Sequence, residues 1–578
     1  MTEFRVWAPD AERSGVSADG RACAMRQEPG GWWSASVPGC AADARYAFLL
    51  GDGGPLPDPR SLRQPSGPDG PSQLYDHEEF AWTDAGWRGR ELRGSVLYEL
   101  HIGTFTAEGT FDAAIGHLDH LSSLGVNVVE LMPVAAFPGC HGWGYDGIGL
   151  WAVHEPYGGP DGLKRFVAAC HERNLAVLLD VVYNHAGVGN RLADFGPYFT
   201  DAHTTPWGPA VNLDQPGSDE VRRFIVANAL MWLRDYHLDG LRLDAVHALA
   251  DNRALHLLEE LAVALGRLEA RLGRRLLLIA ESDANDPRLV TPRDHGGYGL
   301  TAQWSDDFHH ALHAALTGER QGYYCDFGSM AALAKTLTRV FFHDGTWSQF
   351  RGRSHGRPVP TGLLPAEAFI AFQQNHDQVG NRATGDRIGV TLPLDLLKVG
   401  AGLMLTSPFT PMLFMGEEWG ARTPWQYFTD HPDEDLGRAV ADGRRAEFAA
   451  HGWRAGDIPD PQDALTFERS KLDWSELTDP AARELMAWYR DLIALRRTRA
   501  ELTEPCLDEV GAAYDEAERW ILVRRGRLRI AANLGPNLST LPAGAAHGTV
   551  LAASKPGTRL AADGTLVMPS AALAVIQS

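Results

Sequence analysis

From Val96 onward, short apolar runs alternate with longer segments in which apolar residues recur every three or four positions. Several of the short runs are apolar throughout, which is typical of parallel strands that are buried on both faces. Eight runs predict β-strands: Val96–Phe105, Val126–Val134, Ala176–Tyr183, Gly240–Asp244, Leu276–Glu281, Ala302–Trp304, Ala368–Gln373 and Met412–Met415.

The segments between these runs predict amphipathic helices, including Phe111–Leu124, Asp161–Arg173, Ser218–Tyr236 and Arg253–Leu272. Eight strand–helix units in one stretch favour an α/β fold, a closed (β/α)8 TIM barrel. An open doubly wound sheet is the alternative. The Gly-rich phosphate-binding fingerprint that would favour it does not follow the first strand.

The sequence on either side of this stretch predicts two smaller β domains. Residues 1–85 contain short strand-like runs separated by Gly, Pro and Asp, which indicates an N-terminal β-sandwich. The barrel is expected over residues 86–502, with an insertion at about 420–478 before a last helix that begins at Asp479 and Pro480. Strand-like runs return in residues 503–578 and predict a C-terminal β domain.

Composition and charge narrow the class of partner. The chain of 578 residues has a formal net charge of -21, and such an acidic surface repels nucleic acid and anionic lipid but not a neutral glucan. The first residues lack the pattern of a secretory signal, and no stretch reaches the ~18 apolar residues of a membrane span. Six cysteines without CxxC spacing show no metal or redox motif. We therefore expect a cytoplasmic protein with reduced thiols and without membrane attachment.

Polar residues gather where four of the predicted barrel strands end. In a (β/α)8 barrel the active site lies at this C-terminal end of the strands. Strand alternation places Arg242 and Asp244 on one face, away from Leu241 and Leu243. The barrel mouth is thus expected to collect Asp180, Asn184 and His185 from the third strand, Arg242, Asp244 and His247 from the fourth, Glu281 from the fifth, and Asn375, His376 and Asp377 from the seventh.

Several kinds of site could use such residues. A single buried ion pair could merely hold the barrel together, but three carboxylates with two or three imidazoles make a better reaction centre. Metal-assisted hydrolysis would use His and Asp ligands, yet the first strand has no HxH pair and the strand ends carry no lysine. Retaining glycoside cleavage needs a carboxylate nucleophile and a carboxylic acid about 5–5.5 Å apart. Asp244 beside Arg242 suits the nucleophile, and Glu281 between Ala280 and Ser282 suits the acid, so glycoside cleavage is favoured.

The four strand-end stretches resemble the four conserved regions of the α-amylase superfamily, in the family's order. The resemblance implies that Asp244 is the nucleophile, Glu281 the general acid/base and Asp377 a carboxylate that stabilises the transition state. It also implies that Tyr145, within Gly142–Asp146, stacks under the sugar at the cleavage site. Further substrate contacts are expected from Asp180, His185, Arg242, Asn375 and His376. His247 stands where many members carry lysine, and its predicted contact is to the neighbouring subsite.

A closer resemblance covers nearly the full length. FRVWAPDA, DPRSLRQPSGPDGPSQ, YELHIGTFTAEGTF, FPGCHGWGYDG and the segment PFTPMLFMGEEWGARTPWQYFTDH (408–431) are similar to malto-oligosyltrehalose trehalohydrolases. This family implies cleavage of the α-1,4 bond between a trehalose unit and a maltooligosaccharide, no cofactor, an N-terminal domain like a carbohydrate-binding module, and a pairing with malto-oligosyltrehalose synthase. Phe409, Trp425 and Gln426 are expected to form part of a wall around the trehalose unit, or else to pack the insertion against the barrel.

Three alternatives stay open at this point. Branching and debranching enzymes share the sandwich and the four regions, but segment 408–431 is not expected in them. A non-catalytic glucan-binding protein would be expected to have lost catalytic carboxylates, whereas Asp244, Glu281 and Asp377 are all present. By analogy with amylases, a structural calcium ion near Asn184 is also considered.

Overall fold

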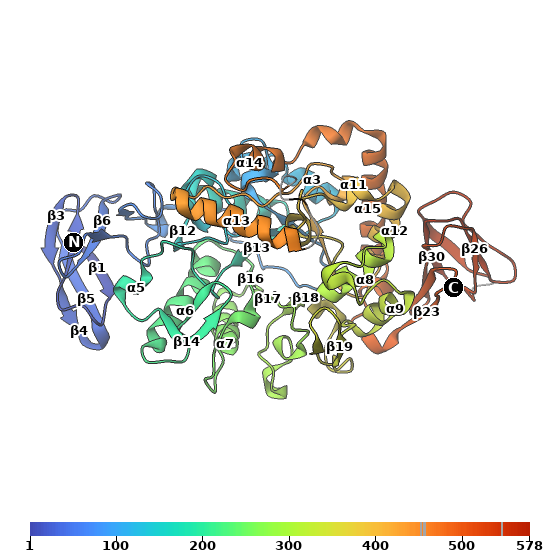
Figure 1. Cartoon of the computed structure of the whole chain (residues 1–578), viewed down its shortest axis with the longest axis horizontal. Helices are drawn as coiled ribbons and strands as arrows, with labels where there is room; N and C mark the ends of the chain where they lie inside the picture. The colour runs from blue at the N-terminus through green and yellow to red at the C-terminus, as the bar shows by residue number, and fades with distance from the viewer. Residues whose placement is uncertain (451–453, 455–457, 545–546) are drawn as a thin grey trace.

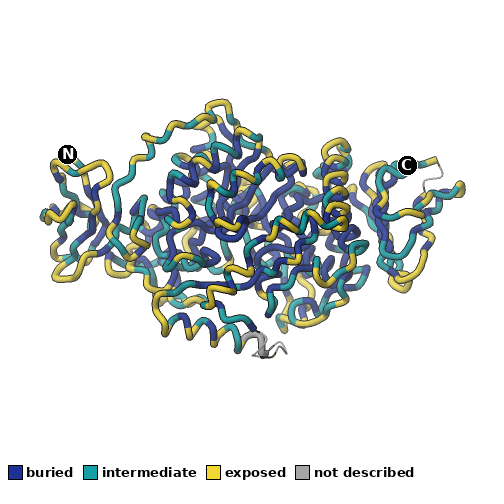
Figure 2. The backbone as a smooth tube through the Cα atoms, turned by 90° about the horizontal axis from the view of Figure 1, so that it is seen from above, coloured by how far each residue is buried: buried dark blue, intermediate teal, exposed yellow. Residues whose placement is uncertain are grey.

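The computed structural model describes residues 1–450, 454, 458–544 and 547–578. Three parts lie in a row along the long axis of the molecule (Figure 1). An N-terminal pair of sheets lies at one end, a closed barrel with its helices occupies the middle, and a C-terminal pair of sheets lies at the other end. Buried residues are concentrated in the middle part (Figure 2), which is therefore the main core of the protein.

The N-terminal part is a β-sandwich. Rings from its two sheets meet in the core, where Phe4 and Tyr46 have centroids 5.0 Å apart. One sheet consists of β1 (Thr2–Trp7), β5 (Trp32–Val37) and β4 (Arg26–Glu28). The other consists of β3 (Arg21–Ala24), β2 (Ser14–Ala18), β6 (Arg45–Leu50), β7 (Pro55–Leu56) and β8 (Ser72–Gln73).

Eight parallel strands close the central barrel, which confirms the predicted fold class. In order around the barrel they are β9 (Leu97–Leu100), β10 (Val128–Leu131), β13 (Ala176–Val181), β16 (Gly240–Leu243), β17 (Leu277–Ala280), β18 (Ala302–Trp304), β21 (Phe369–Phe372) and β22 (Thr410–Phe414). Each overlaps one of the eight predicted runs. The first run was predicted to continue to Phe105, but the strand ends at Leu100 because Ile102–Phe105 form the short helix α1.

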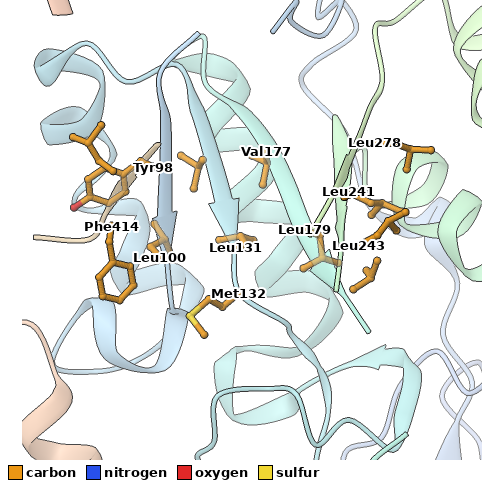
Figure 3. Close-up of a cluster of buried hydrophobic side chains, with 14 of the residues drawn as sticks. Tyr98, Leu100, Leu131, Met132, Val177, Leu179, Leu241, Leu243, Leu278 and Phe414 are labelled. Atoms are coloured by element: carbon orange, nitrogen blue, oxygen red, sulfur yellow. The ribbon is translucent and has the colours of Figure 1, made fainter. Parts of the chain in front are cut away.

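The barrel strands look apolar throughout because both of their faces are buried. Side chains such as Leu97, Leu178 and Phe372 fill the barrel interior. Their neighbours Tyr98, Leu179 and others point outward into the layer between barrel and helices, as Figure 3 shows. This alternation sends Arg242 inward and Leu241 and Leu243 outward, as predicted from the sequence.

The predicted helices are present around the barrel, with two differences. The helix predicted over Phe111–Leu124 is divided into two at Gly116 and His117, and the one predicted over Arg253–Leu272 begins at Leu257. The helices and short strands that connect β9 to β22 are α2 (Phe111–Ile115), α3 (Leu118–Leu124), β11 (Ala135–Ala136), β12 (Gly149–Val153), α4 (Gly159–Glu172), α5 (Leu192–Phe195), β14 (Phe199–Thr205), β15 (Gly208–Val211), α6 (Ser218–Asp235), α7 (Leu257–Leu272), α8 (Asp306–Thr317), α9 (Met330–Arg339), β19 (Thr346–Ser348), β20 (Arg353–His355), α10 (His376–Gly380), α11 (Ile388–Thr391) and α12 (Leu394–Leu405). The fully described connection from β17 to β18 contains only 3-10 turns and no α-helix. This connection therefore departs from the regular strand–helix alternation of the barrel. A helix is disfavoured here by Pro287, Pro292 and Gly297, because proline and glycine destabilise helix interiors.

The predicted insertion follows β22 and contains α13 (Glu434–Ala450) and α14 (Ala464–Ser470). Residues 451–453 and 455–457 of it lie outside the described residues. The last barrel helix, α15 (Pro480–Thr498), begins where the sequence predicted. Pro480 is its first residue, and the side chain of Asp479 accepts a hydrogen bond of 2.9 Å from the N–H of Ala481.

The C-terminal part contains two sheets packed around Leu522, Leu566 and Ile576. The larger sheet has the order β23 (Val510–Asp515), β24 (Trp520–Arg525), β25 (Leu528–Asn533), β30 (Ala572–Gln577) and β27 (Thr549–Ala553). The smaller one consists of β26 (Ser539–Leu541), β29 (Leu566–Met568) and β28 (Arg559–Leu560). Across the described ranges, none of the helices combines the length and apolar character of a membrane span.

Candidate active site

Arg242 is the electrostatic centre of the barrel mouth. It lies on β16 directly beside Asp180 of β13, and its side chain is completely buried. Its Nη1 lies 2.8 Å from Asp180 Oδ2 and 2.7 Å from Asp244 Oδ1, while Nη2 lies 3.9 Å from Glu281 Oε2. The guanidinium also lies over the ring of Trp304, 4.3 Å from its centroid. One buried cation thus donates hydrogen bonds to two carboxyl groups and forms a longer ion pair with a third, and these partners compensate its burial.

Asp244 has a second donor in Asn184. The Nδ2 group of Asn184 donates to Asp244 Oδ2 at 2.7 Å and to the Asp244 carbonyl oxygen at 2.8 Å. The carboxylate is therefore fixed by an arginine and an amide on opposite oxygens. The described residues contain no group of three or more His, Cys, Asp or Glu side chains that could hold a metal ion.

Glu281 is the third carboxyl group beside Arg242, and it lies near Nη2 whereas Asp244 contacts Nη1. Its Oε2 accepts a hydrogen bond of 2.6 Å from the backbone N–H of Ala245. Burial raises the pKa of Glu281 well above its usual range, and the negative charge of Asp244 raises it further, although Arg242 opposes the shift. The group is thus set up to carry a proton at neutral pH.

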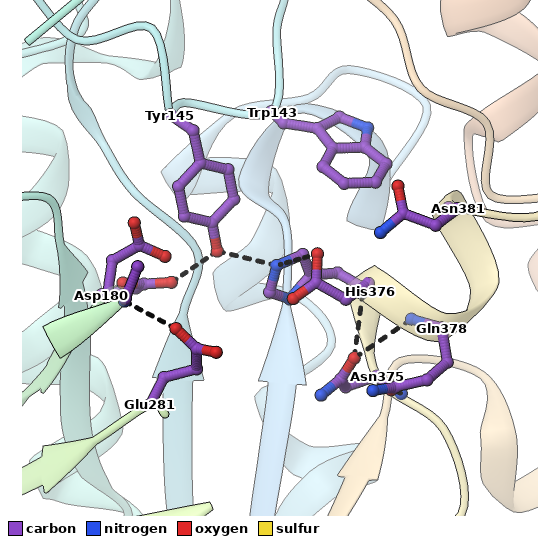
Figure 4. Close-up of polar contacts among 12 residues, drawn as sticks. Trp143, Tyr145, Asp180, Glu281, Asn375, His376, Gln378 and Asn381 are labelled. Carbon is purple, nitrogen blue, oxygen red and sulfur yellow. Dashed lines mark hydrogen bonds and ion pairs between the residues drawn. The ribbon is translucent and has the colours of Figure 1, made fainter. Parts of the chain in front are cut away.

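A buried chain of contacts links the first and seventh strands. His376 Nδ1 lies 2.5 Å from Glu99 Oε1, and its Nε2 lies 2.8 Å from the hydroxyl of Tyr145. That hydroxyl donates to Asp180 Oδ2 at 2.6 Å (Figure 4). Burial disfavours a charged ring at His376, but the charges of Asp377 and Glu99 outweigh it and raise the pKa of His376 to about 9. A cationic His376 therefore faces the mouth.

Asp377 is the carboxylate that is most open to solvent here, with 42% of its side chain exposed. It lies in the first turn of α10, whose N-cap is Asn375. The side-chain oxygen of Asn375 accepts a hydrogen bond of 2.9 Å from the N–H of Asp377, and Gln378 completes a capping box. Asn375 is completely buried and has a capping role that orients Asp377, while its predicted substrate contact stays a prediction.

His185 and His247 differ in their placement. The Nε2 atom of His185 lies 3.1 Å from the carbonyl oxygen of Tyr145, and burial lowers the pKa of the ring. His185 therefore lines the same mouth as Tyr145. His247 lies exposed in the short turn that follows Ala245, beyond the hydrogen-bonded centre.

The structure corrects the sequence interpretation for the predicted wall around the trehalose unit. Phe409 immediately precedes β22, at the end of the strand opposite the mouth, and is buried between the rings of Phe308 and Phe369. Trp425 is also completely buried. It stacks on Trp143 and donates from Nε1 to the carbonyl oxygen of His376 at 3.0 Å. Both residues are packing residues, which was the alternative considered for them.

Gln426 is 8% exposed and serves the same packing layer. Its Nε2 donates to the carbonyl oxygen of Thr384 at 3.1 Å, and its own backbone carbonyl oxygen accepts from Trp143 Nε1 at 3.0 Å. The segment around 425 and 426 therefore supports the back of the site, where it holds α10 and Trp143 in place.

The structure adds three acidic residues that sequence reasoning did not assign. Glu99 and Glu130 are paired positions on β9 and β10, and both are 1% exposed. Asp306 follows β18, and burial together with Asp283 and Asp377 raises its pKa to about 8. Glu99 and Glu130 could have been predicted from the sequence, because an acidic residue inside an apolar parallel strand has to face other polar groups in the barrel.

This geometry offers one fixed carboxylate, one protonated carboxylic acid and one exposed carboxylate around a common opening, with a cationic histidine beside them. Two carboxyl groups in different protonation states are what acid-assisted nucleophilic displacement at a sugar carbon requires.

Comparisons with known proteins agree with this chemistry. The family model described as alpha amylase, catalytic domain, matches residues 73–195, and a domain of unknown function, DUF3459, matches residues 505–575. The crystal structure of a Salmonella typhimurium protein described as a candidate α-amylase has a TM-score of 0.91 and 38% identity, covering 100% of this chain and 97% of that one.

Curated relatives identify a narrower family than the family models and the solved structure do. The malto-oligosyltrehalose trehalohydrolase of Mycobacterium tuberculosis is 55% identical over 547 residues, which is 94% of each chain. That of Saccharolobus solfataricus is 43% identical over 496 residues, covering 86% of this chain and 85% of the relative. With this identity over almost its whole length, the chain belongs to the malto-oligosyltrehalose trehalohydrolase family of the α-amylase superfamily.

Proposed function

We propose that the protein is a retaining glycoside hydrolase that cleaves the α-1,4 bond next to the trehalose unit of malto-oligosyltrehalose. The observation that carries the proposal is the contact of one guanidinium, that of Arg242, with both Asp244 and Glu281, at 2.7 and 3.9 Å. Both carboxyl groups therefore belong to one site, as a nucleophile and an acid that act on the same sugar carbon must. Retention of configuration is the part of the proposal that the resemblance to the α-amylase superfamily implies.

In the first step, an oxygen of Asp244 forms a bond to the anomeric carbon while the glycosidic C–O bond breaks. Glu281 transfers its proton to the leaving oxygen, so that trehalose departs neutral. Arg242 and Asn184 fix Asp244 for this attack. Tyr145 would lie under the sugar ring at this position, and Asp377 and His376 would hold its hydroxyl groups.

In the second step, Glu281 acts as the base. Once Asp244 is esterified it no longer carries the negative charge that raises the pKa of Glu281, so the Glu281 carboxylate becomes more stable. It then accepts a proton from water, whose oxygen attacks the anomeric carbon and releases Asp244. Two displacements at the same carbon give net retention of configuration.

The choice of substrate rests on the curated relatives, which carry the name malto-oligosyltrehalose trehalohydrolase. The substrate is an α-glucan with a trehalose end, and we propose that a malto-oligosyltrehalose synthase supplies it. Mixing the protein with such a synthase and maltooligosaccharides would then yield free trehalose, while the protein alone would yield none from the same maltooligosaccharides.

Product analysis on purified malto-oligosyltrehalose tests the proposal. Free trehalose, together with a maltooligosaccharide released as the α-anomer, is the expected result, and NMR at early times distinguishes the anomers. Changed α-1,6 content without trehalose would instead indicate a branching or debranching enzyme. Binding of glucan without any cleavage would indicate a non-catalytic protein.

A further inference from the structure

We propose that Glu99 is a positioning residue for the cleavage reaction, because it fixes both the orientation and the charge of His376. This inference rests on the proposed function, which gives His376 a contact with the sugar at the cleavage site. Glu99 lies on β9, the first barrel strand, and is only 1% exposed. It therefore acts on the reaction through His376 and not through a substrate contact of its own.

Glu99 holds His376 at two points. Its Oε2 accepts a hydrogen bond of 3.0 Å from the backbone N–H of His376, and its Oε1 lies 2.5 Å from Nδ1 of the ring. The rings of Trp143 and Trp304 pack against the imidazole, with centroids 5.7 and 6.1 Å away. A ring that is bound at its backbone and its side chain by one carboxylate, and enclosed by two indoles, is held in one orientation.

The hydrogen bonds on the other side of the ring require a charged imidazole. Asp180 Oδ2 accepts from Arg242 Nη1 at 2.8 Å and from the hydroxyl of Tyr145 at 2.6 Å. The single hydroxyl proton of Tyr145 is thereby used, so its oxygen has to accept a hydrogen bond from His376 Nε2, which lies 2.8 Å away. The other ring nitrogen faces the Glu99 carboxylate. A histidine that donates from both ring nitrogens is an imidazolium.

The neighbouring buried glutamate, Glu130, does not supply the balancing charge. Glu99 and Glu130 are paired positions on β9 and β10, and both are 1% exposed. Oε2 of Glu130 is buried without a hydrogen-bond partner among the described residues. Burial raises the pKa of Glu130 well above its usual range, and the charge of Glu99 raises it further. The pair therefore carries one negative charge, on Glu99, and one proton, on Glu130.

Charged and titratable groups face His376 from several elements. They are Glu99 on β9, His101 just after it, Glu130 on β10, Tyr145 between β11 and β12, Asp180 on β13, Arg242 on β16 and Asp377 on α10. Burial lowers the pKa of His101 to about 3, so that ring is neutral. Arg242 opposes a charge on His376, whereas Asp377 and Glu99 favour it. Glu99 is the closer of these two carboxylates, since Asp377 Oδ1 lies 3.5 Å from Nε2.

The charge of His376 then acts on two residues that are expected to hold the sugar. Because Nε2 donates to the Tyr145 oxygen, the Tyr145 hydroxyl points to Asp180, which keeps the tyrosine ring in place. The same charge attracts Asp377, whose side chain is 42% exposed. A neutral His376 would lose one of its two N–H donors and most of its attraction for Asp377.

NMR titration of His376 with ¹⁵N-labelled histidine tests the inference, and the signals of His376 are those missing from H376N. In the wild type we expect a pKa of about 9. E99Q keeps an oxygen for the backbone N–H but has no charge, so it should lower this pKa by about 1–3. E99D keeps the charge and should retain much of the raised value. E130Q is the matched control and should leave the titration in place, because Glu130 is already neutral.

The kinetic consequence should follow the same titration. Since His376 loses its proton at lower pH in E99Q, the alkaline limb of kcat/KM on malto-oligosyltrehalose should move to lower pH. At pH 8 we expect kcat/KM to fall about 10- to 100-fold, because misplaced contacts at the reacting sugar have costs of that size. The loss should shrink as the pH falls through the lowered pKa of His376.

A wild-type His376 that titrates at its ordinary pKa of about 6.5 or below would overturn the inference, and this result does not require E99Q to fold. So would a His376 titration that shifts in E130Q but not in E99Q, or one that shifts in E99Q with no change in kcat/KM at any pH. The titration needs no substrate. If E99Q shifts it but the wild type releases no trehalose, the proposed substrate is refuted and the action of Glu99 on His376 stands.

Discussion

The backbone N–H of Ala245 donates a hydrogen bond of 2.6 Å to Glu281 Oε2. Ala245 follows Asp244 and has a φ of 39°, in the left-handed region that residues with a Cβ atom rarely adopt. The turn that ends β16 thus positions two groups at once, the Asp244 carboxylate and the donor to Glu281. Because Oε2 accepts this N–H, we expect the acidic proton of Glu281 on Oε1.

Replacing Glu281 by glutamine should abolish proton transfer but leave the fold intact. The glutamine side chain keeps an oxygen that can accept the Ala245 N–H, but it has no acidic proton for the leaving trehalose. We expect kcat on malto-oligosyltrehalose to fall by ~10²–10⁴-fold or more. An aryl α-maltoside whose leaving group needs no proton should be far less affected in its first step, which a burst measurement would resolve.

Asp244→Asn is the companion variant and should lose activity on both substrates, because no nucleophile remains. Thermal unfolding midpoints close to wild type for both proteins would show that the fold survives. Near-full activity of the Glu281→Gln protein on malto-oligosyltrehalose would contradict the assignment of the acid.

Asp306 should control the alkaline limb of the pH–rate profile. Its pKa is raised to about 8, so it carries a proton at pH 6 and becomes charged above about pH 8. Once charged, it opposes ionisation of Glu281. D306N removes this charge, so the pKa of Glu281 in the alkaline range falls. We expect kcat/KM to decline at lower pH than in the wild type, with little change at pH 6.

The control for D306N is D52N, which removes an acidic side chain that is 95% exposed in the N-terminal sandwich. Above about pH 8 it changes the net charge as much as D306N does, but it should leave the profile in place. An alkaline limb of D306N that coincides with the wild-type limb would show that Asp306 does not act on Glu281.

The sequence alone predicted most of the barrel because its signals are local. Apolar runs buried on two faces marked all eight strands, and Asp479 with Pro480 marked the start of α15. The alternation of side chains within β16 correctly predicted that Arg242 points inward, where it contacts Asp244. Such predictions need only neighbouring residues and the geometry of a strand or a helix end.

Predictions that depended on distant packing were less successful. For Phe409 and Trp425 the sequence left open a substrate wall and a packing role, because an aromatic residue in an apolar segment gives no local sign of whether it faces solvent. Trp425 is buried by Trp143, which is far away in the sequence. The stack of Trp207 on His185 was also not predictable, since it depends on where a hairpin tip meets another loop.

Two glycines, Gly380 of α10 and Gly266 of α7, should respond in opposite ways to an added methyl group. A Cβ at Gly380 would lie 2.0 Å from the ring of Trp143 and 3.0 Å from Trp425 Nε1. G380A should therefore destabilise the protein by about 1–3 kcal/mol through overpacking. It should also lower kcat, by up to about a hundredfold, because α10 carries His376 and Asp377.

Gly266 lies within α7 and has nothing within 4 Å of the position of its Cβ. G266A should stabilise the protein by about 0.5–1 kcal/mol, since alanine is the better helix former, and leave kcat unchanged. Urea unfolding followed by tryptophan fluorescence, with kcat measured alongside, checks both variants. Wild-type stability and activity of G380A would mean that Trp143 can move without disturbing α10.

A buried ion network at the amino end of the barrel should make stability depend on pH. His171 of α4 lies 2.8 Å from Asp84, in the segment between sandwich and barrel, and 2.9 Å from Asp239, just before β16. All three side chains are at most 4% exposed. Burial opposes the charged ring, but the two carboxylates outweigh it and raise the pKa of His171 above 6.5.

Because the folded-state pKa of His171 is raised, its stabilisation is complete below pH 6.5 and is lost as pH rises through the folded-state value. D84N removes one of the two carboxylates that contact His171. The free energy of unfolding at pH 6 should therefore fall by about 3 kcal/mol, and its difference from the wild-type value should shrink at pH 9. D119N, which breaks the surface pair with Arg173, should cost about 0–1 kcal/mol. Urea unfolding at the two pH values measures these differences. An equal loss of unfolding free energy for D84N at both pH values would mean that the network contributes packing and hydrogen bonds but no titrating charge.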